Sequence, residues 1–211
     1  MQKTLLFISA LLLAFYLSGC SRMTAEEFVK TVEQDETFCK TISTPDLEIK
    51  IRCLPKGYFR AKNVVLLHQG TLDSAAMADR DRAFTPSDSM YYFNIEIVRS
   101  RNDSAKGDPV YSMPDEYAFS ASLQQLLFGL REQVFLIDDT DTKVRSMNDL
   151  FERNFGLIPQ KRMFLVFPKV ARDDGRIRMF IDALGSYHVG STVEWKKKKI
   201  EKMSFRGEIN G

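Results

Sequence analysis

The chain has two histidines, His68 and His188, and histidine is the side chain best suited to proton transfer near neutral pH. They are far apart in the sequence, and neither belongs to a His-Glu-x-x-His zinc motif. The sequence also lacks a Gly-x-Ser-x-Gly nucleophile elbow and a glycine-rich phosphate loop. We interpret His68, which follows an apolar run, as a strand-end residue, and His188 as a loop residue. We therefore predict no catalytic residue, no metal ligand and no cofactor.

A group of carboxylates follows the apolar segment Val134-Phe135-Leu136-Ile137. Asp138, Asp139 and Asp141 supply oxygen ligands at short spacing, which is what a calcium site needs. The group lacks the glycine and the distal glutamate of an EF-hand loop. We favour an acidic turn after a strand, and a weak calcium site is the alternative.

The segment 1–19 has the three parts of a secretory signal peptide. Lys3 gives a positive start, a mostly apolar run covers residues 4–17, and the small residues Ser18-Gly19 precede Cys20. The run of about 14 residues is roughly 20 Å long as a helix, whereas the hydrocarbon core of a bilayer is about 30 Å thick. We therefore expect residues 1–19 to be removed as a signal peptide.

The ending Leu17-Ser18-Gly19-Cys20 resembles the lipobox of bacterial lipoproteins. The resemblance implies cleavage before Cys20, diacylation of its thiol and acylation of the new amino terminus. Several acyl chains on one residue anchor a protein stably, and residues 20–23 would then be a lipidated cysteine and a short tether. Ser21 replaces the Asp that favours inner-membrane retention in proteobacterial lipoproteins, which favours the outer membrane. An ordinary secretory signal with a chance cysteine is the alternative.

Cys39 and Cys53 are the cysteines that remain when Cys20 is assigned to lipid. Exported proteins meet oxidising conditions, in which an even pair usually forms a disulfide. A hairpin turning at Asp46 would bring the two cysteines opposite each other. The closed loop of about 15 residues would then stabilise the fold by roughly 3 kcal/mol. Two buried free thiols, or a redox or metal pair, are the alternatives.

Four consecutive lysines, Lys196, Lys197, Lys198 and Lys199, form the strongest run of charge in the chain. Such a run attracts anionic lipid head groups, by about 1 kcal/mol for each charge near the surface. The alternative is a solvated edge strand, in which lysines block association between sheets. We favour the edge strand and keep the contact with a membrane surface as a hypothesis.

The patterns in residues 24–211 predict a single α+β domain, mainly antiparallel sheet with a few helices packed on one side. Predicted helices cover residues 24–34, 71–84 and 146–156, and an apolar stripe predicts another that includes Leu123, Leu126, Leu127 and Leu130. Predicted strands cover residues 47–52, 91–98, 134–137, 163–167 and 177–181, with a return strand at 193–195 after a hairpin loop at 185–190.

The formal net charge is +2, and it falls to about +1 when Lys3 is removed with the signal peptide. This balance argues against a nucleic-acid binder. The segment Phe151-Glu152-Arg153, followed by paired strands, is weakly similar to uncharacterised envelope lipoproteins, and that similarity implies no activity. We expect a lipid-anchored protein of the bacterial envelope that is a non-enzymatic binding or assembly module for another envelope protein. The alternative is an envelope hydrolase that combines His68 or His188 with a carboxylate and a nucleophile.

Overall fold

The computed structural model describes residues 23–45, 47–99, 117, 120–121, 124–125, 128–151, 160–170, 174–184 and 187–205. Several sequence predictions fall outside these ranges: the signal peptide 1–19, the lipidation of Cys20, the turn at Asp46, the helical stripe at Leu123, Leu126 and Leu127, and the part of a predicted helix at 152–156.

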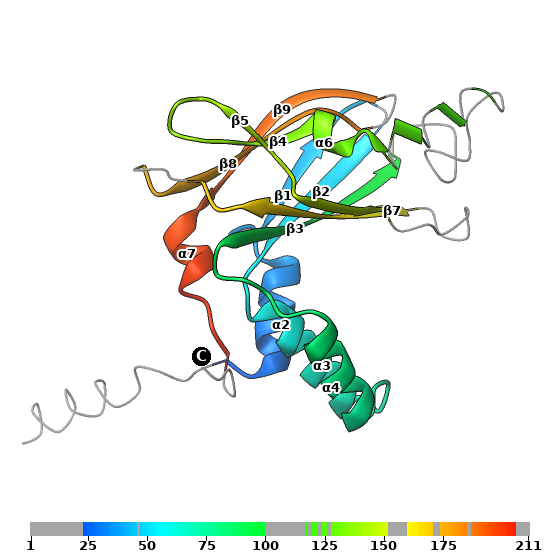
Figure 1. Cartoon of the computed structure of the whole chain (residues 1–211), viewed down its shortest axis with the longest axis vertical. Helices are drawn as coiled ribbons and strands as arrows, with labels where there is room; N and C mark the ends of the chain where they lie inside the picture. The colour runs from blue at the N-terminus through cyan, green and yellow to red at the C-terminus, as the bar shows by residue number, and fades with distance from the viewer. Residues whose placement is uncertain are drawn as a thin grey trace, which may run out of the picture.

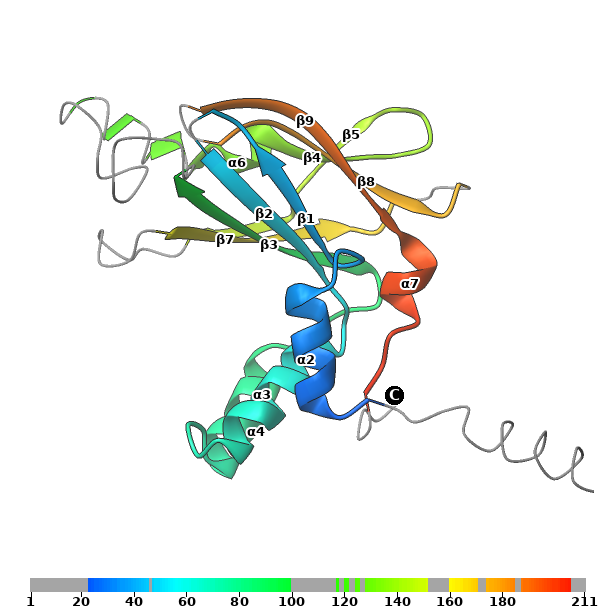
Figure 2. The same ribbon diagram turned by 180° about the vertical axis from the view of Figure 1, so that it is seen from behind.

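The described strands form two antiparallel sheets, which confirms the predicted α+β class. The first sheet has the order β1 (Cys39–Ser43), β2 (Leu47–Leu54), β3 (Met90–Arg99), β7 (Gln160–Pro168) and β6 (Asn148–Phe151). The second has the order β5 (Lys143–Arg145), β4 (Val134–Ile137), β8 (Arg176–Leu184) and β9 (Tyr187–Lys196). Figures 1 and 2 show, from opposite sides, that the second sheet lies over one face of the first.

The core of the protein lies between the two sheets and continues to buried residues of the helices, such as Phe28 and Ala61. Every second side chain of β7 is buried, and β2 and β8 follow the same alternation over most of their length. Trp195 of β9 is 2% exposed, and its ring centroid lies 5.3 Å from that of Phe93 of β3. The Trp195 indole Nε1 also donates a hydrogen bond of 2.8 Å to the backbone carbonyl of Phe38, just before β1. This one side chain therefore ties the second sheet to the first.

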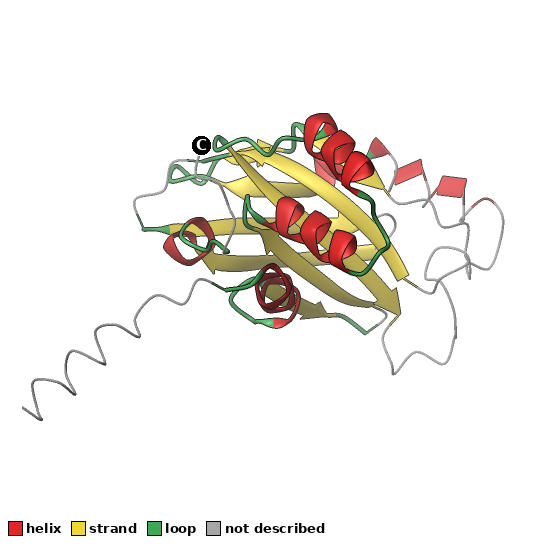
Figure 3. Cartoon of the chain, turned by 90° about the horizontal axis from the view of Figure 1, so that it is seen from below, coloured by secondary structure: helices red, strands yellow, loops and turns green. Residues whose placement is uncertain are grey.

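Three helices lie on the opposite side of the first sheet: α2 (Ala25–Gln34), α3 (Tyr58–His68) and α4 (Ser74–Ala83). Figure 3 shows them in front of the strands when the molecule is seen from below. The capping box at Thr24 forms, because Thr24 Oγ1 accepts from the Glu27 amide at 3.2 Å and Glu27 Oε2 accepts from the Thr24 amide at 2.9 Å. The Phe59 ring of α3 lies 5.4 Å from Tyr92 of β3, which attaches the helices to the sheet. The predicted helices at 24–34 and 71–84 are confirmed.

The predicted helix over residues 146–156 is wrong where the structure describes it. Residues Asn148–Phe151 form β6, which pairs antiparallel with β7 at the edge of the first sheet. Met147 and Leu150, which the apolar face of such a helix would bury, are 58% and 66% exposed. The helical spacing of these apolar residues therefore does not correspond to a buried helix face. Pairing with β7 determines the local structure instead.

Two further segments differ from prediction near β9. The strand begins at Tyr187, so residues 187–190 belong to β9 instead of a hairpin loop over 185–190. Lys196 ends β9, whereas Lys197, Lys198 and Lys199 start the short helix α7 (Lys197–Glu201). The edge-strand interpretation of the lysine run is therefore correct for Lys196 and wrong for the other three. A second short helix, α6 (Leu130–Gln133), precedes β4.

Candidate functional site

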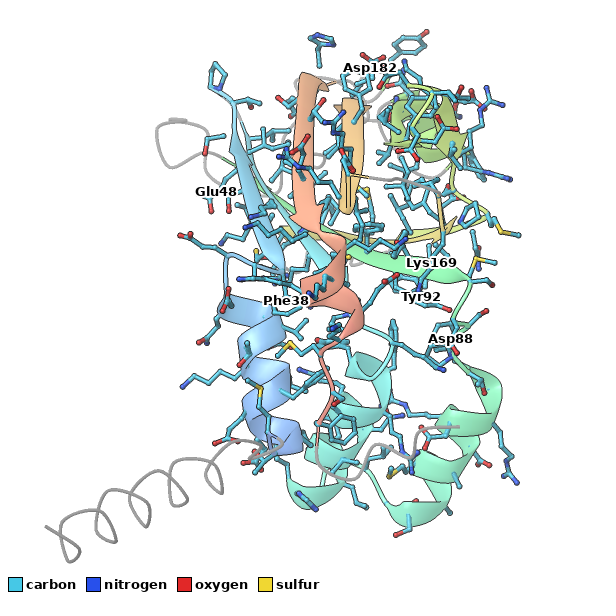
Figure 4. All side chains as sticks on the ribbon, turned by 90° about the vertical axis from the view of Figure 1, so that its left-hand side faces the viewer. Phe38, Glu48, Asp88, Tyr92, Lys169 and Asp182 are labelled. Carbon is cyan, nitrogen blue, oxygen red and sulfur yellow. The ribbon has the colours of Figure 1, made fainter. Side chains whose placement is uncertain are left out.

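A cleft of about 350 Å³ lies where α7 and the residues after it pass the ends of β2, β3 and β7. We call it the α7 cleft. Three segments line it, together with Lys169: residues 54–57 at the end of β2, residues 87–88 and 90–91 around the start of β3, and residues 200–204. Figure 4 labels Lys169 and Asp88 on neighbouring elements between the sheets and the helices. The backbone amide of Lys169 donates to the carbonyl of Ser89 at 2.8 Å, which joins the end of β7 to the start of β3.

One wall of the α7 cleft carries a linked group of three polar side chains. Lys169 Nζ lies 2.9 Å from Glu201 Oε1, and the Tyr91 hydroxyl donates to the same oxygen at 3.3 Å. Lys169 Nζ also lies 5.4 Å from the centroid of the Tyr91 ring. Burial raises the pKa of Tyr91, and the charge of Glu201 raises it further, so the hydroxyl stays protonated and acts as a donor.

A second pair of opposite charges also lines the α7 cleft. Lys56 Nζ donates to Asp88 Oδ2 at 2.9 Å, and the two side chains are 47% and 81% exposed. The hydrogen bond from Lys56 lowers the pKa of Asp88, which keeps this carboxylate ionised. Exposed pairs of this kind contribute little to stability. The α7 cleft therefore contains cationic and anionic groups. A charged ligand can bind one of them by replacing its partner in the ion pair.

No protein-family model matches the sequence, and no curated protein matches it. Among solved structures, it is similar to a novel protein of unknown function from Burkholderia pseudomallei K96243, with 15% sequence identity and a TM-score of 0.43. The match covers 87% of this chain and 95% of that chain.

The two cysteines lie on adjacent strands and point to opposite faces of the first sheet. Cys39 of β1 pairs with Arg52 of β2, whereas the predicted hairpin had Cys39 opposite Cys53. This difference of one residue in register moves the side chains to opposite faces. Cys53 is fully buried, Cys39 is half-buried, and both are free thiols in the structure. The predicted register is wrong, and the predicted disulfide is not formed in the structure.

Alkylation of the native protein without reductant should label half-buried Cys39 slowly, but much faster than Cys53, which should hardly be labelled at all. Burial raises the pKa of both thiols and leaves Cys53 without access to the reagent. Mass spectrometry of peptides after timed alkylation measures both sites, and unfolding in denaturant should expose Cys53. If both cysteines are labelled only after reduction, they form the disulfide and the β1–β2 register differs from the one described.

The two histidines lie on α3 and β9, which belong to different layers (Figure 1). Neither histidine lines the α7 cleft. His68 is the last residue of α3, so its interpretation as a strand-end residue is wrong. His188 lies in β9 opposite Ala183 of β8, so its interpretation as a loop residue is also wrong. A Cβ atom on Gly190 would lie 3.1 Å from His188 Nε2, and Gly190 has a φ of +56°. The ring of His188 therefore packs over a position that favours glycine.

The carboxylates after β4 form the predicted acidic turn. Asp138 Oδ1 accepts from the amides of Thr140 and Thr142, both at 2.9 Å, and from the Thr140 hydroxyl at 2.7 Å. Asp141 has a φ of 58°, in the left-handed region. In the part of the chain that the structure describes, no group of three or more His, Cys, Asp and Glu side chains is placed to hold a metal ion.

The charged residues of the α7 cleft were not identified from the sequence. Lys56 is far from Asp88 along the chain, and Lys169 is equally far from Glu201. Each ion pair joins segments that meet only in the folded protein, so no local spacing in the sequence predicts it. Tyr91 is 3% exposed, on the buried face of the strand that the sequence predicts over residues 91–98. A hydroxyl at the end of an otherwise apolar face was the only available signal.

Proposed function

We propose that this protein is a lipid-anchored binding or assembly module of the bacterial envelope that holds a protein partner in the α7 cleft. The supporting observation is that two ion pairs line this cleft, Lys169 with Glu201 and Lys56 with Asp88. A charged side chain or chain end of a partner can replace one member of such a pair. Recognition by complementary charge gives specificity and fast association at little cost in stability.

The position of the α7 cleft near the start of the described chain favours this proposal. Met23 forms a parallel bridge with Phe205, directly after residues 200–204, which line the cleft. The short segment from Cys20 to Met23 can span at most about 11 Å. A lipid on Cys20 would therefore hold the neighbourhood of Phe205 close to the membrane, with Ser21 favouring the outer membrane. No described helix has the length and apolar character needed to cross a bilayer.

The chemistry of the cleft favours binding over the hydrolase alternative. Its walls bring together two lysine–carboxylate pairs and a protonated tyrosine, instead of His68 or His188. The Tyr91 hydroxyl donates to Glu201, and its raised pKa makes it a poor nucleophile. These groups are suited to holding a charged ligand through hydrogen bonds and ion pairs.

Site-specific crosslinking of the full-length protein in cells tests the proposal. A photo-reactive residue at Met203, which lines the cleft, should crosslink to a discrete envelope protein. The same group at Leu150, 66% exposed on the distant edge strand β6, should not give this product. Equal crosslinking from both positions would contradict recognition by the cleft.

Exchanging the charges of Lys169 and Glu201 should lower the Met203 crosslink by roughly tenfold. The variant Lys169→Glu with Glu201→Lys keeps the internal attraction, but it presents like charges to the partner. The matched control exchanges Arg82 and Asp79, an exposed ion pair on α4, and should leave the yield unchanged. An unchanged yield in the cleft variant, at normal protein level, would rule out this site.

A further inference from the structure

A second cavity, of about 430 Å³, lies on the other side of α7. Four cations from four elements line it: Lys40 of β1, Arg176 of β8, Lys196 of β9 and Lys199 of α7. Lys40 lies in the amino-terminal half of the chain, far from the other three in the sequence. We call this the lysine cavity, because the fold brings Lys40 next to Lys196 and Lys199, two of the four lysines in the run.

The charges around the lysine cavity do not cancel. The guanidinium of Arg176 donates to Glu194 at 2.6 Å, and this bond lowers the pKa of that carboxyl. Glu194 is therefore neutralised by its own neighbour. Glu36 is the other lining carboxylate, so the three lysines exceed the remaining negative charge. Among the described residues, the ion pairs that involve lysine are those of Lys50, Lys56, Lys62 and Lys169, so the three cavity lysines are not among them.

The positive potential of the lysine cavity reaches a neighbouring carboxylate outside it. Hydrogen bonds from Thr37 are the main cause of the lowered pKa of Asp35. The charges of Lys199 and Lys40 lower it further, in that order. Two lysines from different elements thus act on the same point, which is the effect that an anionic ligand would meet on entering the cavity.

The backbone that carries these cations is fixed. Trp195, which also lines the cavity, is buried and its indole is hydrogen-bonded to the carbonyl of Phe38, just before the strand of Lys40. The amide of Lys197 donates to the carbonyl of Gly175 at 2.9 Å, which holds the start of α7 against the turn before β8. The lysine ammonium groups can therefore converge on a ligand from backbones that need no rearrangement.

We propose that the lysine cavity binds a phosphorylated anion, with Lys40, Lys196 and Lys199 contacting its phosphoryl oxygens. Several ammonium groups around one cavity suit a multiply charged anion with oxygen atoms on all sides, better than they suit a single planar carboxylate. The volume exceeds that of one phosphate and accommodates a diphosphate or a phosphorylated head group. This site does not depend on the α7 cleft or on its partner.

Binding of inorganic pyrophosphate to the full-length protein in neutral detergent micelles tests the site by calorimetry. We expect Lys196→Ala with Lys199→Ala to weaken binding by about tenfold or more, because two charge-assisted contacts are lost. Lys40→Ala should also weaken binding, although it lies outside the lysine run. The matched control is Lys197→Ala with Lys198→Ala, which removes the same charge from the same run but no lining residue, and it should change binding by less than about twofold.

Equal losses of affinity in the two double variants would show a diffuse attraction to the lysine run and would overturn the proposal. The proposal would also be overturned if the protein bound neither pyrophosphate nor short-chain phosphatidic acid. Melting curves of each variant verify folding. Short-chain phosphatidic acid, below its micellar concentration, distinguishes the source of the phosphoryl group. Tighter binding than pyrophosphate indicates a lipid head group, and weaker binding indicates a free phosphorylated ligand. Short-chain phosphatidylcholine, which carries no net charge, should bind to neither wild type nor variants.

Discussion

Replacing Cys20 with alanine is expected to abolish acylation and to stop normal processing of the signal peptide. The thiol of Cys20 is the only group that the Leu17-Ser18-Gly19-Cys20 motif provides for the diacyl chains. Stable anchoring takes more than one acyl chain, so the variant should leave the membrane fraction or remain as the uncleaved precursor. Mass spectrometry of the amino-terminal peptide, combined with membrane fractionation, measures both effects.

Cys39→Ala is the matched control for this experiment, because it removes a cysteine outside the motif and should leave acylation intact. An unmodified Cys20 in the wild-type protein, or a mature chain that starts elsewhere, would refute the lipoprotein assignment. The proposal that the α7 cleft lies close to the membrane would then lose its basis. The proposal for the lysine cavity would stand, since its residues and contacts are independent of the anchor.

Strands with strict alternation were predictable because burial of one face fixes their period. Residues 91–98 and 177–181 alternate in sequence and are strands in the structure, as is the apolar run at 163–167. The helix after Thr24 was predictable because its capping box is a local interaction between Thr24 and Glu27. In each case the determining interaction can be read within a short stretch of sequence.

The failures arose where a distant partner decides the local structure. Leu150 and its neighbours have helical spacing, but β7 supplies a strand to pair with, and the resulting edge strand leaves Leu150 exposed. The β1–β2 register was missed by one residue, which changes the face on which Cys39 lies. Turn residues in a sequence locate a hairpin only approximately, and packing of the two strands fixes the final register.

Both candidate sites required the tertiary structure. The α7 cleft pairs charges that lie on segments distant in the sequence, and the lysine cavity joins Lys40 to the run that starts at Lys196. The lysine run was visible in the sequence as a block of charge. Its division into two lining and two non-lining residues depends on the transition from β9 to α7 at Lys197.

Trp195→Ala is expected to have the largest effect on stability, with a loss of about 3–5 kcal/mol in the free energy of unfolding. The substitution leaves a cavity between the sheets, removes the contact with Phe93, and leaves the carbonyl of Phe38 without its donor. Trp195→Phe keeps most of the packing and loses the hydrogen bond, so it should cost about 1–2 kcal/mol. Equilibrium unfolding in urea, with a shifted midpoint and an unchanged slope, measures both values.

Leu150→Ala is the control for this series, because Leu150 is 66% exposed and its truncation should change stability by less than about 0.5 kcal/mol. We expect the loss of stability to decrease in the order Trp195→Ala, Trp195→Phe, Leu150→Ala. The reason is that Trp195 of β9 contacts β3, which belongs to the other sheet. A Trp195→Ala variant as stable as the Leu150→Ala control would mean that the sheets do not pack through this residue. A typical domain is stable by only about 5–15 kcal/mol, so the expected loss is a large share of the total.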